Sequence, residues 1–198
     1  MAMDSKRRAL KLVADRISAC RECPGMNERG VTGSAAGYGS EDSPVAIVGQ
    51  SLCRACMETG IPFTGGSGSY IDNALKLAGR AKSEIFITNV VHCHPPDDRP
   101  SHRHEIDNCR HFLHEELDVV RPRLIIGLGK DAKEALSSRY PDGRHLAWPF
   151  VKPRASRQDM TYLLFPEHPG SLRFKKTPDR AYYSPSLARA ITWAFDSR

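Results

Sequence analysis

The sequence predicts an α/β fold, in which helices cover both faces of a central, mostly parallel four-stranded sheet and form a three-layer α/β/α sandwich. Two features lead to this prediction. Four short apolar runs are continuous rather than alternating, which is typical of strands buried on both faces. Segments with apolar residues at helical spacing separate these runs, and strands that alternate with helices pair in parallel through right-handed crossovers.

The four expected strands are rich in Val, Ile, Leu and Phe. Ligands of parallel sheets bind at the carboxyl ends of the strands, so the residues that leave those ends are the first candidates for chemistry. The Gly-Leu-Gly at 127–129 lacks the rest of a dinucleotide-binding fingerprint, and we expect it to be structural. The strands are predicted at 45–49, 85–91, 124–129 and 161–165.

The expected helices have apolar residues three or four positions apart. In the first helix, Leu10, Val13 and Ile17 share one face. Pro122 cannot continue a helix and ends the third one, and Asp131 is a suitable cap for the fourth. The helices are predicted at 6–19, 70–77, 105–120, 131–136 and 187–195.

The composition is that of a globular protein. The chain has 198 residues, of which 40% are hydrophobic and 26% charged, and this fits a single domain over residues 1–198. No run approaches the roughly 20 apolar residues that cross a bilayer, and no apolar segment follows the charged N-terminus as in a secretory signal. We therefore expect a cytoplasmic monomer without a membrane partner.

Positive charge is concentrated in the C-terminal part of the chain. The formal net charge is +6, and residues 144–180 carry eight Lys or Arg against three Asp or Glu. Such a stretch binds polyanions, because neutralisation of phosphates releases counterions. A solvated surface is the alternative, and charge alone does not decide between the two.

The six cysteines form two Cys-x-x-Cys pairs and two isolated positions. In a cytoplasmic protein, metal ligands or free thiols are expected more than disulfides. The two pairs could hold a zinc ion, or the first pair and the two isolated cysteines could hold a [4Fe–4S] cluster; spacing alone leaves both open. The pairs are Cys20 with Cys23 and Cys53 with Cys56, and the isolated residues are Cys93 and Cys109.

Six histidines also lie close together in the sequence, between positions 92 and 114. Two of them, His92 and His94, form a His-x-His ahead of two prolines, where we expect exposed loop side chains. His111 and His114 lie at helical spacing among charged residues, where we expect contact with solvent. We therefore do not assign a metal site to these histidines.

Three segments together resemble a known family. The segment Gly60-Ile-Pro-Phe63-Thr-Gly-Gly-Ser-Gly68 matches part of the first motif of the iron–sulfur (family 4) uracil-DNA glycosylases, Thr-Gly-x-Pro-Phe-x-Gly-x-x-Gly, read from Thr59. Ile87-Thr-Asn89 with Cys93, followed by two prolines, resembles the family's Ile-Thr-Asn-x-x-Lys-Cys-Arg-Pro-Pro segment. His168-Pro-Gly-Ser-Leu172 resembles its His-Pro-Ser-x-Leu loop. The resemblance covers residues 15 to 195.

The resemblance implies a DNA repair enzyme that extrudes uracil from DNA and hydrolyses its N-glycosidic bond. It assigns a structural [4Fe–4S] cluster to Cys20, Cys23, Cys93 and Cys109, and leaves Cys53 and Cys56 as additional cysteines. The expected partner is uracil-containing or single-stranded DNA.

The resemblance also assigns the base pocket. Asn89 would pair with N3–H and O4 of uracil, because an amide offers both a donor and an acceptor, and Phe63 would stack on the base. His168 would stabilise the negative charge on the departing base. Gln50 and Ser51 would complete the catalytic and base-binding set.

The DNA contacts are expected on two loops. Ser67, Ser171, Arg173 and Lys175 would bind phosphates near the lesion, and Leu172 would insert into the space that the extruded base leaves.

The first motif departs from the family pattern. Where the family has Gly-Glu-x-Pro-Gly, this chain has Gly49-Gln-Ser-Leu-Cys53, so the carboxylate and the proline are absent. Glu58 in the same loop is a candidate substitute for the carboxylate. The alternative function is therefore a protein of this fold that binds DNA or acts on another damaged base without excising uracil; a redox carrier is a third class.

Overall fold

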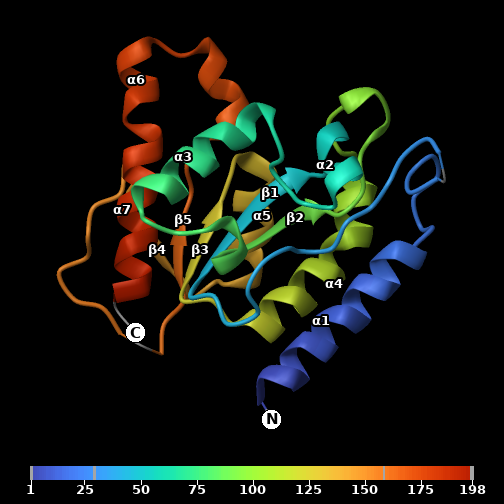
Figure 1. The fold of residues 1–198 in the computed structure, drawn as a ribbon, viewed down its shortest axis with the longest axis horizontal. Helices are drawn as coiled ribbons and strands as arrows, with labels where there is room; N and C mark the ends of the chain where they lie inside the picture. The colour runs from blue at the N-terminus through green and yellow to red at the C-terminus, as the bar shows by residue number, and fades with distance from the viewer. Residues whose placement is uncertain (1, 29, 158, 197–198) are drawn as a thin grey trace.

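The computed structural model describes residues 2–28, 30–157 and 159–196. Its centre is a five-stranded sheet in the order β2-β1-β3-β5-β4, with every neighbouring pair parallel (Figure 1). The predicted α/β sandwich with a parallel sheet is therefore confirmed, with one strand more than expected. The strands are β1 (Val45–Ser51), β2 (Phe86–Val91), β3 (Leu124–Gly127), β4 (Arg144–Leu146) and β5 (Tyr162–Leu164).

The additional strand, β4, corrects the expected number of four. It has only three residues, and Arg144 and His145 are exposed because β4 lies at the edge of the sheet. A strand that is not buried needs no apolar run, so the pattern that identified the other four strands is absent from this one.

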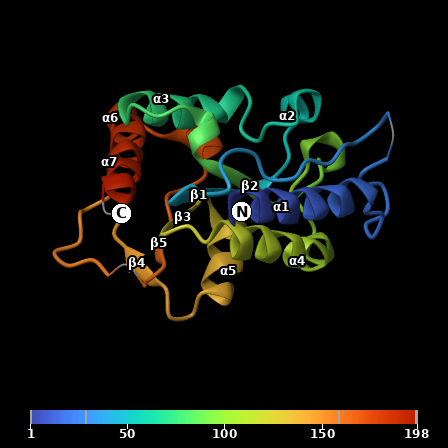
Figure 2. The ribbon, with the colours of Figure 1, turned by 60° about the horizontal axis from the view of Figure 1, so that its bottom comes forward.

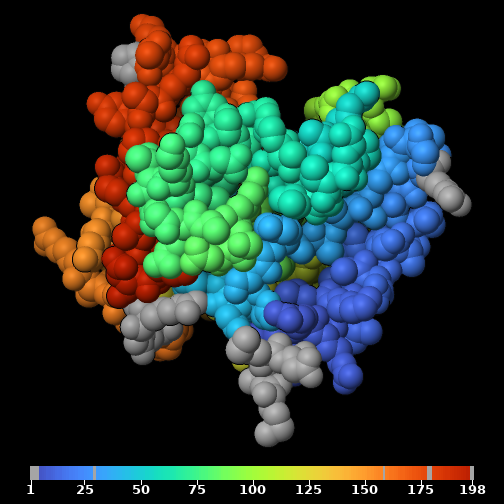
Figure 3. Space-filling model, viewed as in Figure 1, coloured from blue at the N-terminus to red at the C-terminus, as the bar shows by residue number. Residues whose placement is uncertain are grey.

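Helices cover both faces of the sheet, as Figure 2 shows. The helices α3 (Ser69–Leu77) and α7 (Tyr183–Asp196) pack on one face, and α1 (Ala2–Ala19), α4 (Arg103–Val120) and α5 (Lys130–Arg139) lie on the other. In Figure 3, α3 and the segment leading to it hide most of the sheet on the face in view. The short helices α2 (Arg54–Thr59) and α6 (Thr177–Ala181) were not expected from the sequence.

The central strand β1 shows why its apolar run is continuous. Val45 and Ile47 face the core under α3 and α7, whereas Ala46 and Val48 face the core under α1, α4 and α5. Successive side chains of a strand point to opposite faces, so a strand between two helical layers needs apolar residues at every position.

None of the helices in the described ranges combines the length and the apolar character of a membrane-spanning segment.

A buried polar network joins β2, α4 and the loop before β1. The Glu116 carboxylate accepts hydrogen bonds from the Gly37 N–H (2.7 Å) and the Thr88 hydroxyl (2.5 Å), and lies 3.1 Å from His92 Nε2. Burial opposes the charge of His92, but the Glu116 carboxylate, together with Cys109, outweighs it and raises the pKa of His92 to about 10. His92 is 1% exposed, so the expectation of an exposed side chain was wrong: the carboxylate on α4 gives the imidazole a buried partner.

We expect Glu116→Gln to destabilise the protein by roughly 3–5 kcal/mol, because it leaves the buried donors of this network without a common carboxylate. The measurement is the free energy of unfolding in denaturant. Glu115→Gln is the matched control on the same helix: Glu115 pairs with Arg16 at the surface, so its loss should cost about 1 kcal/mol or less. Equal losses in the two variants would contradict the buried role of Glu116.

Candidate functional site

A pocket of about 360 Å³ opens at the carboxyl end of the sheet, where β1 and β2 end. Its size falls within the range of small-molecule sites. The residues predicted from the sequence for base binding and catalysis, which come from four separate segments, all line it. The lining comprises Gln50, Ser51, Leu52, Cys53, Arg54, Ala55, Cys56, Phe63, Thr64, Gly65, Gly66, Ser67, Asn89, His94, Pro95, Asp98, Arg99 and His168.

The pocket floor depends on a glycine in β1. Gly49 pairs with Asn89 across the sheet, and a Cβ atom on Gly49 would lie 2.4 Å from Asn89 Oδ1 and 2.6 Å from Phe63 Cζ. The amide of Asn89 and the ring of Phe63 therefore meet directly above the Gly49 backbone. Any side chain at this position would have to displace one of them.

The Asn89 side chain is buried and faces the pocket, with 3% of its surface exposed. Within the described ranges, no hydrogen bond engages its side-chain amide. A buried amide without a partner is unfavourable unless a ligand or water supplies one. Asn89 thus offers the pocket one donor face and one acceptor face.

Phe63 is held in place by its backbone. Its φ of 56° lies in the left-handed region, which is uncommon for a residue with a side chain. Two neighbours secure this conformation: Lys82 Nζ donates to the Phe63 carbonyl at 2.8 Å, and Gly68 leaves room for that carbonyl because a Cβ there would lie 1.9 Å from it. The ring consequently lies beside Asn89 at the pocket, with 6.4 Å between the Phe63 and His168 ring centroids.

His168 follows β5 and begins the turn Pro169–Phe174. Its Nδ1 accepts a hydrogen bond from the Gly170 N–H at 3.1 Å, so the proton of the neutral ring resides on Nε2. Burial lowers the pKa of His168, which favours this neutral form. Gly129 lies against the ring's base, where a Cβ would come within 3.0 Å of His168 Cβ. The pocket therefore receives a neutral N–H donor.

Gln50 and Ser51 end β1 at the pocket and are half-buried. The Gln50 amide donates from Nε2 to Asp131 Oδ2 at 2.7 Å. Glu58, the candidate substitute for the missing carboxylate, is exposed on α2 and does not line the pocket. Asp131 is the carboxylate that contacts this part of the wall, and the sequence suggested only a helix cap for it.

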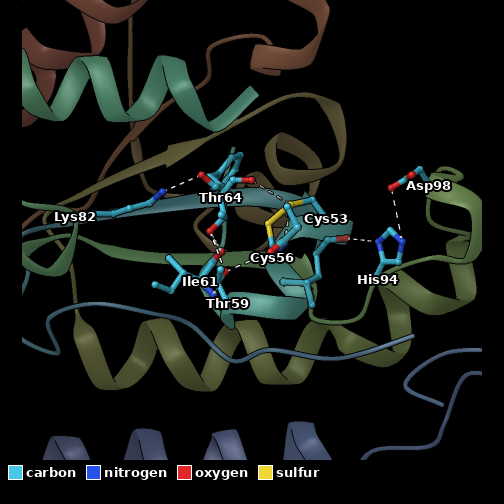
Figure 4. Close-up of a disulfide and its surroundings, with 11 residues drawn as sticks. Cys53, Cys56, Thr59, Ile61, Thr64, Lys82, His94 and Asp98 are labelled. Carbon is cyan, nitrogen blue, oxygen red and sulfur yellow. Dashed lines mark hydrogen bonds and ion pairs between the residues drawn. A yellow bond between two sulfur atoms is a disulfide. The ribbon is translucent and has the colours of Figure 1, made fainter. Parts of the chain in front are cut away.

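Cys53 and Cys56 form a disulfide in the pocket wall, which Figure 4 shows. The expectation that the cysteines are ligands or free thiols was therefore wrong for this pair, and with it the zinc site made of both pairs. The physical reason is the turn at the start of α2: Cys53 caps the helix, its Cα lies 5.0 Å from that of Cys56, and this separation suits a disulfide.

His94 also lines the pocket, although a solvent-exposed side chain was expected. It is 3% exposed; its Nδ1–H donates to the Leu52 carbonyl at 2.9 Å, and its Nε2 lies 3.7 Å from Asp98 Oδ1 (Figure 4). The Leu52 N–H donates in turn to the Cys93 carbonyl at 3.3 Å. The wall that contains the disulfide is thereby bonded to the loop that carries Cys93.

Four free cysteines line a second, smaller pocket on the other side of that loop. In the described part of the chain, no three His, Cys, Asp or Glu side chains are arranged to bind one metal ion. Burial raises the pKa of the Cys93 thiol to about 12, so this thiol ionises only when a cation compensates the charge. The four are Cys20, Cys23, Cys93 and Cys109.

The residues expected to contact DNA divide into two groups. Ser67 lines the pocket, and Arg173 and Lys175 are exposed beside it. Ser171 uses its hydroxyl inside the turn, where it donates to the His168 carbonyl at 2.8 Å. Leu172 is 1% exposed and belongs to the core, which corrects the expectation that it inserts into DNA.

The arrangement matches a known superfamily. The sequence profile of the Uracil DNA glycosylase superfamily matches residues 36–188, which include the whole pocket. The chain belongs to the uracil-DNA glycosylase superfamily. The resemblance seen in the sequence motifs is thereby confirmed.

Several curated relatives within this superfamily carry the name Type-4 uracil-DNA glycosylase. The chain is 34% identical to one from Pyrobaculum aerophilum over 127 residues, which is 64% of each chain. It is 30% identical to one from Thermotoga maritima over 130 residues, or 66% of this chain and 67% of that one. A third, from Sulfurisphaera tokodaii, is 23% identical over 193 residues, with 92% and 80% covered. The chain thus spans about two thirds of the length of the first two relatives.

A solved structure supports the fold. The crystal structure of Pedobacter heparinus SMUG2 aligns with 79% of this chain and 77% of its own, with a TM-score of 0.50 and 13% sequence identity. At this identity the likeness concerns the α/β fold alone.

Three features of the site were not evident from the sequence: the disulfide, the buried His94 and the contact of Asp131 with Gln50. The last had one available signal, since Asp131 closely follows the carboxyl end of a predicted strand. The roles assigned to the pocket residues remain predictions.

Proposed function

We propose that this protein is a DNA repair glycosylase that extrudes uracil from DNA and hydrolyses its N-glycosidic bond. The observation that carries the proposal is the meeting of Asn89, Phe63 and His168 in one pocket. The names of the type-4 relatives agree with it. We propose further that one domain over residues 1–198 performs this reaction as a monomer in the cytoplasm.

Uracil fits the polar groups of the pocket. The Asn89 amide has no protein partner among the described residues, and it can accept a hydrogen bond from uracil N3–H and donate one to O4. The Phe63 ring beside it supplies a face for stacking, which stabilises an extruded base. Cytosine carries an acceptor at N3 and a donor at position 4. An Asn89 amide oriented for uracil would therefore place acceptor against acceptor and donor against donor when cytosine is in the pocket.

His168 supplies the donor for the leaving group. When the bond between C1′ and N1 breaks, the electron pair leaves with uracil, and a neutral Nε2–H can donate to the developing charge on O2. The Gly170 N–H fixes this tautomer before the substrate binds, so no proton has to move within the ring.

The basic surface beside the pocket is proposed to bind the DNA backbone. Arg173 and Lys175 are exposed on and after the turn that His168 begins, where they can neutralise phosphates. Phe174 in this turn is 79% exposed, with the Arg173 guanidinium 4.6 Å from its ring centroid. We propose that Phe174, in place of the buried Leu172, stacks on the bases next to the extruded one.

The four cysteines of the second pocket are proposed to hold a [4Fe–4S] cluster. Their side chains are free and converge on one cavity, and burial keeps the Cys93 thiol from ionising without a cation. These properties fit a cluster with one thiolate on each iron. The cluster would cross-link the end of α1, the loop after β2 and α4.

One observation favours a second candidate function. Gln50 has no charge, so it provides no carboxylate of its own at the sugar. A protein with this pocket could bind extruded bases in DNA, or act on another damaged base, without excising uracil.

We expect the purified protein to convert uracil in a single-stranded oligonucleotide into alkali-labile abasic sites. Asn89→Ala should lower the single-turnover rate by about 100-fold or more, because it removes both hydrogen bonds to the base edge. Asn73→Ala, a matched change on the exposed side of α3, should leave the rate unchanged. The absence of abasic sites at stoichiometric wild-type protein would support the second candidate instead.

The excision rate should stay constant as the pH falls from 8 to the ordinary His value of about 6.5, and should decline only below it. The reason is that burial lowers the pKa of His168, so the donating neutral form persists to lower pH than in a free histidine. Below about pH 6.5 the His168 side chain is protonated in the unfolded chain before it is protonated in the folded protein. The free energy of unfolding should therefore decrease as the pH decreases through this range. A rate that increases as the pH falls through 6.5 would show that the imidazolium is the active form.

Protein purified without oxygen should be brown and contain about four irons for each chain. Cys109→Ser should lose iron and visible absorption. Cys53→Ser is the matched control and should keep both, because Cys53 is bonded to Cys56 in the other pocket. A colourless wild-type protein that contains zinc would exclude the cluster.

A further inference from the structure

The Gln50 side chain is fixed by a partner outside the pocket lining. Its Nε2 donates to Asp131 Oδ2 at 2.7 Å, and Gln50 is half-buried at the end of β1. An ionised carboxylate only accepts hydrogen bonds, so the NH₂ end of the amide must face Asp131. The carbonyl oxygen of the same Gln50 amide is then free to accept a hydrogen bond in the pocket.

Asp131 occupies a position that links three strand ends. It is the second residue of α5, the helix that follows β3, and Gly129, just before this helix, lies against His168. Gln50 at the end of β1 reaches it from one side. Asp131 therefore contacts the β1 wall of the pocket from a helix whose N-cap residue, Gly129, lies against His168.

The charge of Asp131 has no cationic partner within the described ranges. Its neighbour on the same helix, Glu134, lies within ion-pair distance of Lys130 and Arg103, and its exposed side chain projects to the surface. The two carboxylates of α5 thus differ: Glu134 is paired at the surface, and Asp131 bonds to a pocket side chain.

We infer that Asp131 is a positioning residue for hydrolysis of the N-glycosidic bond, an inference that rests on the proposed function. It orients the Gln50 amide so that its carbonyl oxygen accepts a hydrogen bond from the attacking water, and the bond to a carboxylate polarises that amide. The water oxygen bonds to C1′ as the bond to N1 breaks, the electron pair leaves with uracil, and the water proton passes to solvent.

Asp131→Asn is the informative variant because it preserves size. The new side chain has no charge and carries a donor as well as an acceptor, so it no longer holds the Gln50 carbonyl in one orientation. We expect the single-turnover rate of uracil excision to fall by about tenfold or more, with the affinity for uracil-containing DNA unchanged within about twofold. Glu134→Gln removes one negative charge from the same helix and should leave both quantities unchanged.

Gln50→Glu tests the pairing through the pH profile. It places two carboxylates at the 2.7 Å contact of the original pair, where both cannot stay ionised. The excision rate of this variant should therefore fall as the pH rises above the ordinary carboxyl range. Adding Asp131→Asn to Gln50→Glu should abolish this decline, because an amide then faces the new carboxylate.

The thermal stability of the same variants tests the contact between Asp131 and Gln50 without relying on catalysis. The thermal stability of Gln50→Glu relative to wild type should decrease as the pH rises, and the second substitution should restore it. If wild-type protein excises uracil but Asp131→Asn is as fast, or Gln50→Glu shows no pH-dependent loss, this inference is overturned. If the wild type excises no uracil, the proposed function and the catalytic role both fail, while the unfolding cycle still decides whether Asp131 holds Gln50.

Discussion

The site depends on close approach at Gly49. Because this residue has no side chain, the Asn89 amide on the adjacent strand and the Phe63 ring from the following loop can meet above its backbone. Parallel pairing places the carboxyl ends of β1 and β2 at the same edge, and the loop after α2 returns to it. The backbone thus brings together an amide that can hydrogen-bond to the edge of a base and a ring that can stack on its face, before any ligand is present.

The sequence predicted the parts of this molecule that follow from burial and from motif spacing. The strands buried on both faces were found because every position must be apolar. The motifs of the resemblance predicted that Asn89 and His168 belong to one pocket, and both line it, Asn89 from within β2 and His168 from the segment after β5. It did not predict β4, whose exposed edge needs no such pattern. Leu172 was misplaced because it joins the core cluster to which α3, distant in sequence, contributes. His92 was misplaced because Glu116, 24 residues later on α4, gives it a buried partner.

The two pockets are mechanically connected. Leu52 donates its N–H to the Cys93 carbonyl and accepts a hydrogen bond from His94, so the wall of the base pocket and the cysteine-bearing loop share backbone bonds. On the far side, Arg99 of the pocket lining binds Glu105 of α4 through two hydrogen bonds, one turn before Cys109. Whatever the four cysteines bind, ordering of that loop and helix also orders the base pocket.

The edges of the sheet have a consequence for behaviour at high concentration. At one edge, β4 presents Arg144 and His145 to solvent, and charged side chains discourage the addition of another chain. At the other edge, the loop before β1 forms antiparallel bridges from Ser34 to Cys93 and from Tyr38 to Ile87, which occupy backbone groups beside β2. Because one edge carries charged side chains and the other is already hydrogen-bonded to a loop, strands of further molecules are disfavoured from pairing with either edge.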